Sequence, residues 1–377
     1  MNVAIFTDND FGKVNGVTTT LKAVLDYAPA HIRPRIYTCE PQGCDRPNYL
    51  ALRAFGVGIP FYREMKVYLA PFRRFLRHAV ADRIDVIHYT TPGPVGLAAI
   101  WVSSQVGVPL VGSFHTDLAE YTRVLSGWAR LGDLMQEYMR RQYGKCHRIL
   151  APSESTRRML IGARIDPDKI GIWRRGVSAE RFTPAKRSAS LREQWQVSDT
   201  RPALLYVGRL SREKNLSAIV STERALEQCG IPHRLVFVGD GPLRQELQSS
   251  SRNAVFTGTL SPDDVAVAMA SADLFVFPSL TDTAGNVVLE AQASGLPVVV
   301  TNVGGPHENM IAGRTGVVST DQDDFVRLTS LLARSANRRK WLGRHARAYA
   351  QERRWEASLE PLYHAYAEAN AQGRVAA

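Results

Sequence analysis

The chain alternates short apolar runs with amphipathic helical patterns. The apolar runs of its first half are Val3 to Thr7, Arg35 to Cys39, Val86 to Tyr89, Leu110 to Phe114, Ile149 to Ala151 and Ile170 to Trp173. Helical periodicity lies between them at Thr18 to Tyr27, Pro94 to Val106 and Leu131 to Tyr143. Strands that alternate with helices are typical of a doubly wound parallel sheet. The pattern therefore predicts an α/β domain.

The same rhythm begins again after a polar stretch. Further strands are predicted at Ala203 to Val207, Arg234 to Val238, Val255 to Thr257, Leu274 to Phe277 and Val298 to Val300. A length of 377 residues also favours two cores over one. We expect domains at 1–180 and 202–354, a linker at 181–201, and a last amphipathic helix that Pro361 interrupts early. Ligands would bind at the carboxyl ends of the strands, in a cleft that the two sheets share.

The stretch Thr281 to Gly295 is the strongest candidate for chemistry, because it is a predicted strand-to-helix turn. Backbone N–H groups and the positive end of the helix dipole would gather near Gly285, Asn286 and Val287, an arrangement that suits a diphosphate. Two carboxylates bracket this anion site, Asp282 before the helix and Glu290 two turns inside it. The alternative is an ordinary capped helix with one solvated glutamate.

Two cations follow the first strand of the second half. Arg209 and Lys214 could both reach a diphosphate and stabilise the charge that grows on a leaving group, or they could form a surface salt-bridge cluster with Glu213. Val238 to Pro242 is predicted to be a turn that lets the backbone pass close to a ligand.

The first half offers weaker candidates. A glycine loop, Phe11 to Val17, follows the first strand but has neither the dinucleotide nor the Walker pattern. Its exposed backbone at Gly16 could approach a phosphate. His115 ends a predicted strand, where it could face a ligand or be a structural histidine. Asp8-Asn9-Asp10 has a D-x-D pattern but lacks partners for a metal site.

Charge and cysteine usage narrow the class of protein. The net charge is +11, and most of the excess lies in residues 1–180. The segment 53–83 is both basic and aromatic, which favours an anionic membrane surface over nucleic acid, although a solvated basic helix face is the alternative. The four cysteines lack zinc or disulfide spacing. Without a predicted membrane span or signal peptide, we expect a cytoplasmic protein.

Together these motifs resemble the family 4 retaining glycosyltransferases of GT-B fold, from Met1 to about Asn370. The shared features are Asn15-Gly16-Val17, Pro92-Gly93-Pro94, His115-Thr116-Asp117, Gly208-Arg209-Leu210 with Lys214, Gly239-Asp240-Gly241-Pro242 and the acidic motif around Glu290. Thr281-Asp282-Thr283 and Phe114 to Asp117 are most similar to the branch of GDP-mannose-dependent α-mannosyltransferases and sulfoquinovosyl diacylglycerol synthases.

The resemblance implies two Rossmann-like domains that face a central cleft, with the helix at 355–377 crossing back to the first domain. It also implies roles for individual residues. Glu290 would hold the ribose hydroxyls, and His115 would touch the donor sugar. Asp282 replaces the first glutamate of the family's paired motif with a shorter carboxylate. The diphosphate would be held by Arg209, Lys214, Gly16 and the amides of Gly285, Asn286 and Val287.

The implied site contains three sets of residues. The catalytic set is His115, Arg209, Lys214 and Asp282. The donor-binding set is Asn15, Gly16, Gly208, Thr283, Gly285, Asn286, Val287 and Glu290. The membrane or acceptor set is Arg63, Lys66, Arg73, Arg74, Arg77, Asp117 and Tyr121.

The implied reaction moves a hexose, first mannose from GDP-mannose and next glucose from UDP-glucose, to a hydroxyl of a lipid or glycolipid. The anomeric configuration would be retained because the leaving diphosphate accepts the proton of the acceptor. The nucleotide diphosphate sugar is a co-substrate, and neither a cofactor nor a metal is expected to be required. The enzyme would act at the inner face of the membrane. The alternatives are a nucleotide-sugar epimerase and a non-catalytic module that binds nucleotides or membranes.

Overall fold

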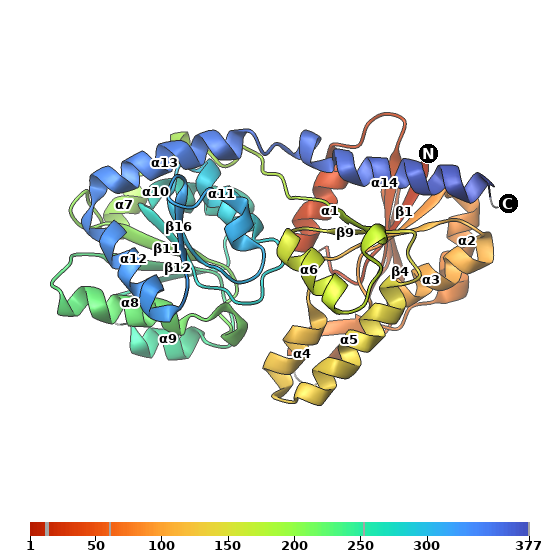
Figure 1. Cartoon of the computed structure of the whole chain (residues 1–377), viewed down its shortest axis with the longest axis horizontal. Coiled ribbons are helices and arrows are strands. Elements are labelled where there is room, and N and C mark those ends of the chain that lie inside the picture. The colour runs from red at the N-terminus through yellow and green to blue at the C-terminus, as the bar shows by residue number, and fades with distance from the viewer. Residues whose placement is uncertain (12–14, 60–61, 252, 376–377) are drawn as a thin grey trace. The chain divides into compact units, whose positions relative to one another are not determined.

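The computed structural model describes residues 1–11, 15–59, 62–251 and 253–375 (Figure 1). The chain forms two compact units. The first contains Met1–Arg175 and Ser358–Ala377, and the second contains Gly176–Ala357. Each unit has its own sheet and its own hydrophobic core. The predicted pair of α/β domains is therefore confirmed.

The first unit is built on an eight-stranded sheet with the order β10-β9-β8-β7-β1-β2-β4-β3. The strands are β1 (Asn2–Phe6), β2 (Arg33–Glu40), β3 (Cys44–Arg46), β4 (Tyr49–Arg53), β7 (Val86–Tyr89), β8 (Leu110–Ser113), β9 (Arg148–Ala151) and β10 (Ile170–Ile172). Neighbouring strands run parallel except β3, which pairs antiparallel with β4. Strand order reverses between β1 and β7, so a crevice for ligands is expected at their carboxyl ends.

Helices and one hairpin complete the first unit. The helices before the last strand are α1 (Gly16–Asp26), α2 (Phe72–Ala81), α3 (Pro94–Val106), α4 (Leu118–Ser126), α5 (Ala129–Tyr143) and α6 (Glu154–Gly162), and η1 (Pro167–Lys169) is a 3-10 turn. The antiparallel hairpin of β5 (Gly56–Ile59) and β6 (Tyr62–Tyr68) forms a separate small sheet. α4 and α5 pack against each other as a helical hairpin (Figure 1).

The second unit has a six-stranded parallel sheet with the order β13-β12-β11-β14-β15-β16. Its strands are β11 (Ala203–Val207), β12 (Arg234–Val238), β13 (Val255–Gly258), β14 (Leu274–Phe277), β15 (Val298–Thr301) and β16 (Gly316–Ser319). Every residue of β14 and β15 is buried. Parallel strands that are covered on both faces read as continuous apolar runs, which is why the sequence reveals them.

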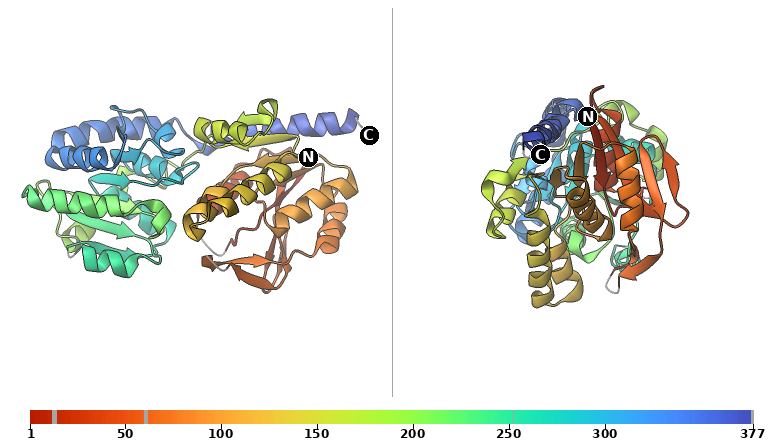
Figure 2. Two further views of the ribbon diagram at one scale, coloured as in Figure 1. Left: turned by 60° about the horizontal axis from the view of Figure 1, so that its bottom comes forward. Right: turned by 90° about the vertical axis from the view of Figure 1, so that its right-hand side faces the viewer.

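Helices cover this sheet in two layers (Figures 1 and 2). α8 (Ser217–Gln228) packs against α12 (Gln322–Arg334), while α11 (Asn286–Ala293) packs against α10 (Pro262–Ser271) and α13 (Ala336–Gln351). The remaining elements are α7 (Ala189–Gln194), α9 (Arg244–Ser250) and the 3-10 turns η2 (Pro184–Lys186), η3 (Arg212–Lys214) and η4 (Pro306–Asn309).

The stretch expected to be a linker, 181–201, contains η2 and α7 and belongs to the second unit. Two of its arginines fasten it to the sheet. Arg187 and Arg192 form ion pairs with Asp273 at 3.0 and 2.9 Å, and the same carboxylate accepts a hydrogen bond from the backbone N–H of Ala203.

The last helix, α14 (Trp355–Val375), runs through Pro361 without a break, so the predicted interruption is wrong. Pro361 is the seventh residue of the helix, beyond the first turn, so it removes one intrahelical hydrogen bond. The helix continues because packing of its buried face offsets that loss. From Ser358 onward the helix belongs to the first unit. Its buried positions, Leu359, Leu362, Ala365, Tyr366 and Ala369, recur every three or four residues along one face.

Candidate functional site

The candidate residues of the second unit follow two neighbouring strands. Arg209 and Lys214 come after β11, and the loop 281–285 comes after β14. β11 and β14 lie side by side in the sheet, at the point where the strand order reverses. Ligands of open α/β sheets bind at this position. The fold therefore brings these two sequence motifs to one edge of the sheet.

An ion pair joins the two motifs. The Lys214 ammonium donates to Asp282 Oδ2 at 2.7 Å, and their side chains are 12% and 24% exposed. Thr281 adds a bond from its hydroxyl to the backbone oxygen of Glu213 at 3.4 Å. Partial burial strengthens such a pair relative to an exposed one, because solvent screens it less. The structure thus shows an ion pair of Lys214 with Asp282, a partner that neither the diphosphate interpretation nor the alternative cluster with Glu213 had named.

The segment 304–309, which is not among the residues predicted from the sequence, packs against the loop 281–285 and forms hydrogen bonds with its backbone. The backbone N–H of Gly305 donates to Asp282 O at 2.8 Å, and a Cβ at Gly305 would lie 2.0 Å from Thr283 O. The Asn309 side chain donates to Ala284 O. The signal that could have revealed this support is Gly304-Gly305-Pro306, separated by two residues from the end of the strand β15, since paired glycines allow close backbone approach.

α11 begins at Asn286, one residue before the predicted start at Val287, and a glycine lies at its amino-terminal end. Gly285 has φ +67° and lies against Pro306, which a Cβ would approach to 2.9 Å. The first helical residues are Asn286 and Val287, whose backbone N–H groups lie in the first turn of the helix. The helix N-terminus is therefore held rigidly beside Asp282 and Thr283.

Glu290 lies about one turn inside α11, not two turns, because the helix begins at Asn286. Burial raises the pKa of its carboxyl to about 7, and the nearby positive charge of Arg181 opposes that rise. A carboxylate placed in a desolvated position is costly in the empty protein. It gains stability when ligand donors such as hydroxyls reach it.

Arg209 comes directly after Gly208, whose backbone lies close to that of Gly239 in a second turn. A Cβ on Gly239 would lie 2.0 Å from Gly208 O, and Gly208 itself has φ +153°. The Tyr206 hydroxyl donates to Arg209 O at 2.9 Å and fixes the backbone there. Burial lowers the pKa of the Arg209 guanidinium, and Glu213 opposes that shift. The turn at 238–242 therefore passes close to the backbone at Gly208, and its approach to a ligand stays a prediction.

In the first unit, Asn15 caps α1. Its side-chain oxygen accepts from the N–H groups of Val17 and Thr18, each at 2.9 Å, and its own N–H donates to the Thr18 hydroxyl at 3.0 Å. This capping box explains why an asparagine stands at this position, and the explanation requires no ligand. Gly16 is the exposed first residue of the helix. The rest of the predicted glycine loop, 12–14, lies outside the described residues.

His115 lies just beyond the end of β8. Its Nε2 is 2.7 Å from Ser113 Oγ, and its Nδ1 is 3.2 Å from the Arg175 guanidinium. Burial lowers the pKa of the imidazole well below its usual value, and the charge of Arg175 lowers it further. His115 is therefore a neutral side chain at physiological pH. Arg175 was not predicted from the sequence, because nothing there distinguishes this residue from the adjacent Arg174.

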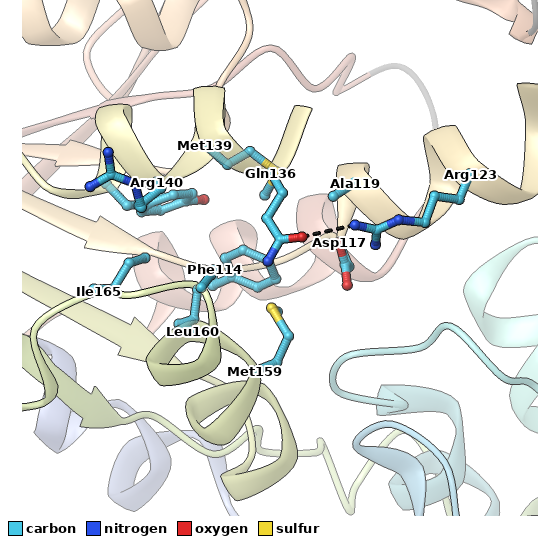
Figure 3. A pocket seen from close by; sticks show the side chains of 12 residues that line it. Phe114, Asp117, Ala119, Arg123, Gln136, Met139, Arg140, Met159, Leu160 and Ile165 are labelled. Carbon is cyan, nitrogen blue, oxygen red and sulfur yellow. Dashed lines mark hydrogen bonds between the residues drawn. The ribbon is translucent and has the colours of Figure 1, made fainter. Parts of the chain in front are cut away.

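Asp117 is the N-cap of α4 and accepts from the Glu120 N–H at 3.0 Å. Burial raises the pKa of its carboxyl. It borders a cavity of about 70 Å³, which Figure 3 shows between α4, α5 and α6 with the Arg123 guanidinium bonded to Gln136 at 2.8 Å. This volume holds a few waters, not a hexose. Tyr121 is a half-buried residue of α4.

The predicted basic surface falls on α2 and the β5–β6 hairpin. Arg73, Arg74 and Arg77 are all exposed on α2. Phe55 and Leu69, at the ends of the hairpin, are 74% and 62% exposed. Arg63 and Lys66 lie on β6, but their side chains are outside the described part of the structure. A segment that exposes both arginines and large apolar side chains suits an anionic lipid surface.

Asp8, the first member of the D-x-D pattern, anchors the start of α3 through hydrogen bonds. It accepts from the Thr91 hydroxyl at 2.6 Å and from the Val95 N–H at 2.9 Å, at the start of α3. Burial raises the pKa of this carboxyl. Among the described residues, no cluster of three or more histidine, cysteine or acidic side chains could bind a metal. In the same part of the chain, no helix is both long and apolar enough to cross a membrane.

Comparison with known proteins finds a matching family model in each of the two units. Residues 14–181 match the family model described as Glycosyltransferase Family 4, and residues 201–334 match Glycosyl transferases group 1. A GDP-mannose-dependent alpha-mannosyltransferase of Mycobacterium tuberculosis is 31% identical over 368 residues, covering 96% of this chain and 95% of the relative. Sulfoquinovosyl transferase SQD2 of Arabidopsis thaliana is 32% identical over 315 residues, and the match spans 80% of this chain and 60% of that protein.

The fold itself also has solved counterparts. Anabaena Alr3699/HepE, solved in complex with UDP-glucose, superposes with a TM-score of 0.77 at 18% sequence identity. The match covers 98% of this chain and 100% of that protein. Such similarity at low identity is evidence for a shared fold.

Proposed function

Because this chain belongs to glycosyltransferase family 4 and has the GT-B fold, as its motifs predicted, we propose that it transfers a hexose with retention of anomeric configuration. The donor is a nucleotide diphosphate sugar, with GDP-mannose as the first choice and UDP-glucose as the second. The acceptor is a hydroxyl of a lipid or glycolipid. The mannosyl donor is favoured by the name of the Mycobacterium tuberculosis relative.

The observation that carries this proposal is the meeting of Lys214, Asp282 and the α11 N-terminus after β11 and β14. Arg209, Lys214 and the amides of 285–287 supply positive charge for a diphosphate, and they stabilise it most as the sugar leaves. Asp282 is available for hydroxyls of the sugar. The ion pair holds the Lys214 ammonium in one place before the donor arrives, which reduces the reorganisation that binding requires.

The remaining donor contacts are assigned as follows. Glu290 accepts bonds from the ribose hydroxyls, which compensate for its buried charge. Gly208 and Thr283 let the backbone approach the donor, and in the first unit Gly16, positioned by the Asn15 cap, contributes to diphosphate binding. His115, being neutral, contacts the donor sugar without acting as an acid or a base. The leaving diphosphate takes the acceptor proton, so the reaction needs neither a separate general base nor a metal.

A sugar-nucleotide screen tests the donor. Thermal shift of the purified full chain is measured with GDP-mannose, UDP-glucose and UDP-N-acetylglucosamine, because a true donor stabilises the folded state by mass action. Turnover is then followed as release of nucleotide diphosphate with a panel of lipid acceptors, and the anomeric configuration of the product is read by NMR. Absence of nucleotide diphosphate release from every donor across the panel refutes the transferase proposal.

We further propose that the basic surface of α2 docks the enzyme on the inner face of an anionic membrane and brings the acceptor lipid to the first unit. Asp117 and Tyr121, with Arg63 and Lys66, complete this acceptor side. Each arginine near such a surface is worth about 1 kcal/mol. Neutralising Arg73, Arg74 and Arg77 together should therefore weaken binding to phosphatidylserine vesicles by about 100-fold.

A matched triple variant controls for net charge. Arg334, Arg338 and Arg344 are exposed in the second unit, and replacing them with glutamine removes the same charge. This control should bind vesicles with nearly the affinity of the unchanged protein. Equal weakening by both triple variants would mean that binding follows net charge alone, and the α2 surface would then have no special role.

A further inference from the structure

A chain of buried polar side chains leads away from His115. Ser113 Oγ lies 2.7 Å from His115 Nε2 and 2.6 Å from His88 Nε2. His88 Nδ1 in turn lies 2.7 Å from the Tyr366 hydroxyl. At the other end, the Arg175 guanidinium lies 3.2 Å from His115 Nδ1. The chain joins β7, β8, α14 and the segment after β10, all in the first unit.

We propose that Arg175, Ser113, His88 and Tyr366 are positioning residues that hold His115 in one tautomer and one ring orientation for the donor sugar. This inference rests on the proposed contact between His115 and the donor. None of the four positioning residues needs to touch substrate. They act by fixing both ring nitrogens of the residue that does.

The direction of the first two hydrogen bonds follows from Arg175. A guanidinium only donates hydrogen bonds, so His115 Nδ1 must accept. The ring proton of the neutral imidazole is then on Nε2, and that N–H donates to Ser113 Oγ. Both nitrogens are engaged, so a 180° rotation of the ring would put carbon atoms in their places, break both hydrogen bonds and leave buried polar groups unpaired.

Arg175 is suited to this role because its own position is fixed. Its side chain is buried, its guanidinium carbon lies 4.3 Å from the centre of the Trp173 ring, and it donates to Trp173 O at 3.3 Å. The partners that the structure describes for it are all neutral. Burial lowers the pKa of Arg175 to about 9, which still leaves it a cation at neutral pH.

The charged state of the histidines agrees with the geometry. His88 and Arg175 are the titratable groups that act on His115, and both disfavour a second proton on its ring. Burial lowers the pKa of His88 to about 3. The Trp173 indole lies edge-on to the His115 ring, with centroids 6.0 Å apart, and excludes water from that side. Neither histidine should therefore titrate between pH 5.5 and 8.5.

Tyr366 explains why the last helix matters for the site. It lies 278 residues beyond His88 in sequence, and α14 brings its hydroxyl to the far end of the chain. Its ring is fully buried and packs against His88 with centroids 5.6 Å apart. His88 and Tyr366 thus hold the Ser113 hydroxyl where it can accept from His115.

The direct test reads the tautomer in the full-length protein. Long-range nitrogen-proton NMR on ¹⁵N-histidine-labelled protein, with His115 assigned by loss of its signal in His115→Gln, reports which ring nitrogen carries the proton. The expected result is a neutral ring protonated on Nε2 from pH 5.5 to 8.5. A proton on Nδ1, or titration near pH 6.5, overturns the inference. This readout requires no activity, so it stands or falls separately from the proposed transferase function.

Kinetics test the link to the donor. Ser113→Ala should lower kcat about tenfold with little change in KM, because misplacement of a contact group affects the reacting geometry more than donor binding. Ser103→Ala is the control, since Ser103 makes a bond of 2.7 Å to Val108 O elsewhere in the unit. A folded Ser113→Ala variant with unchanged kcat overturns the inference, as does an equal loss in the control. If Ser113→Ala does not fold, Tyr366→Phe takes its place in the same comparison.

Discussion

Replacing Glu290 with glutamine tests whether the buried carboxylate lowers the free energy of unfolding of the ligand-free protein. The pKa of this carboxyl is about 7 in the folded protein, compared with 4.5 for a free glutamate. The folded state therefore binds more protons than the unfolded state between these values. As pH rises through this window, the unfolded chain ionises first, and the free energy of unfolding decreases. Above pH 7 the destabilisation is complete.

The magnitude follows from the same two values. A difference between 4.5 and about 7 corresponds to an upper limit of roughly 3.5 kcal/mol, since one pKa unit is worth about 1.4 kcal/mol. Glutamine has nearly the same shape but cannot ionise. The Glu290→Gln variant should therefore be more stable than the unchanged protein at pH 8. For a unit of this size the gain is on the order of 5 to 10 °C in the melting temperature of the second unit.

The assay is differential scanning calorimetry of the ligand-free protein at pH 4.5, 6 and 8. The two proteins should melt together at pH 4.5 and separate progressively toward pH 8. Glu193→Gln, an exposed position on α7, serves as the control and should show little separation at any pH. A Glu290→Gln variant that is equally stable or less stable at pH 8 refutes the claim that burial raises the pKa of this carboxyl.

Three further predictions concern other parts of the chain. Lys214→Met and Asp282→Asn should each weaken donor binding. A double-mutant cycle of the two variants, measured by urea unfolding, should give a coupling free energy of about 1 kcal/mol. Additive effects of the two substitutions on stability would mean that the ion pair contributes nothing. Asp8→Ala should lower the free energy of unfolding of the first unit by about 1 to 3 kcal/mol, measured by urea denaturation, because the start of α3 loses its acceptor; an unchanged midpoint would contradict this. Gly305→Ala should reduce the thermal shift given by a donor, because its Cβ displaces Thr283 O, while Gly162→Ala, which meets open space, should not.

Local pattern was enough to predict most strands of the two sheets, because buried parallel strands are continuous apolar runs whatever their order. It did not predict β3, β4 or β16, which lie at or next to the edges of the two sheets. It also located the turns after β11 and β14, whose glycines and polar residues are local signals. The capping role of Asn15 is equally local, since it involves only the next turn of the same helix. The family resemblance came from such turns in their order along the chain.

Which of these residues meet depends on the three-dimensional arrangement of the strands. Lys214 pairs with Asp282 because β11 and β14 are neighbours, and strand order is not encoded in the spacing of apolar runs. The support from 304–309, the pKa of Glu290 and the contact of Tyr366 with His88 likewise depend on burial and packing between distant segments. Local patterns fix the elements, whereas the environment of each side chain is set by whatever the fold packs against it.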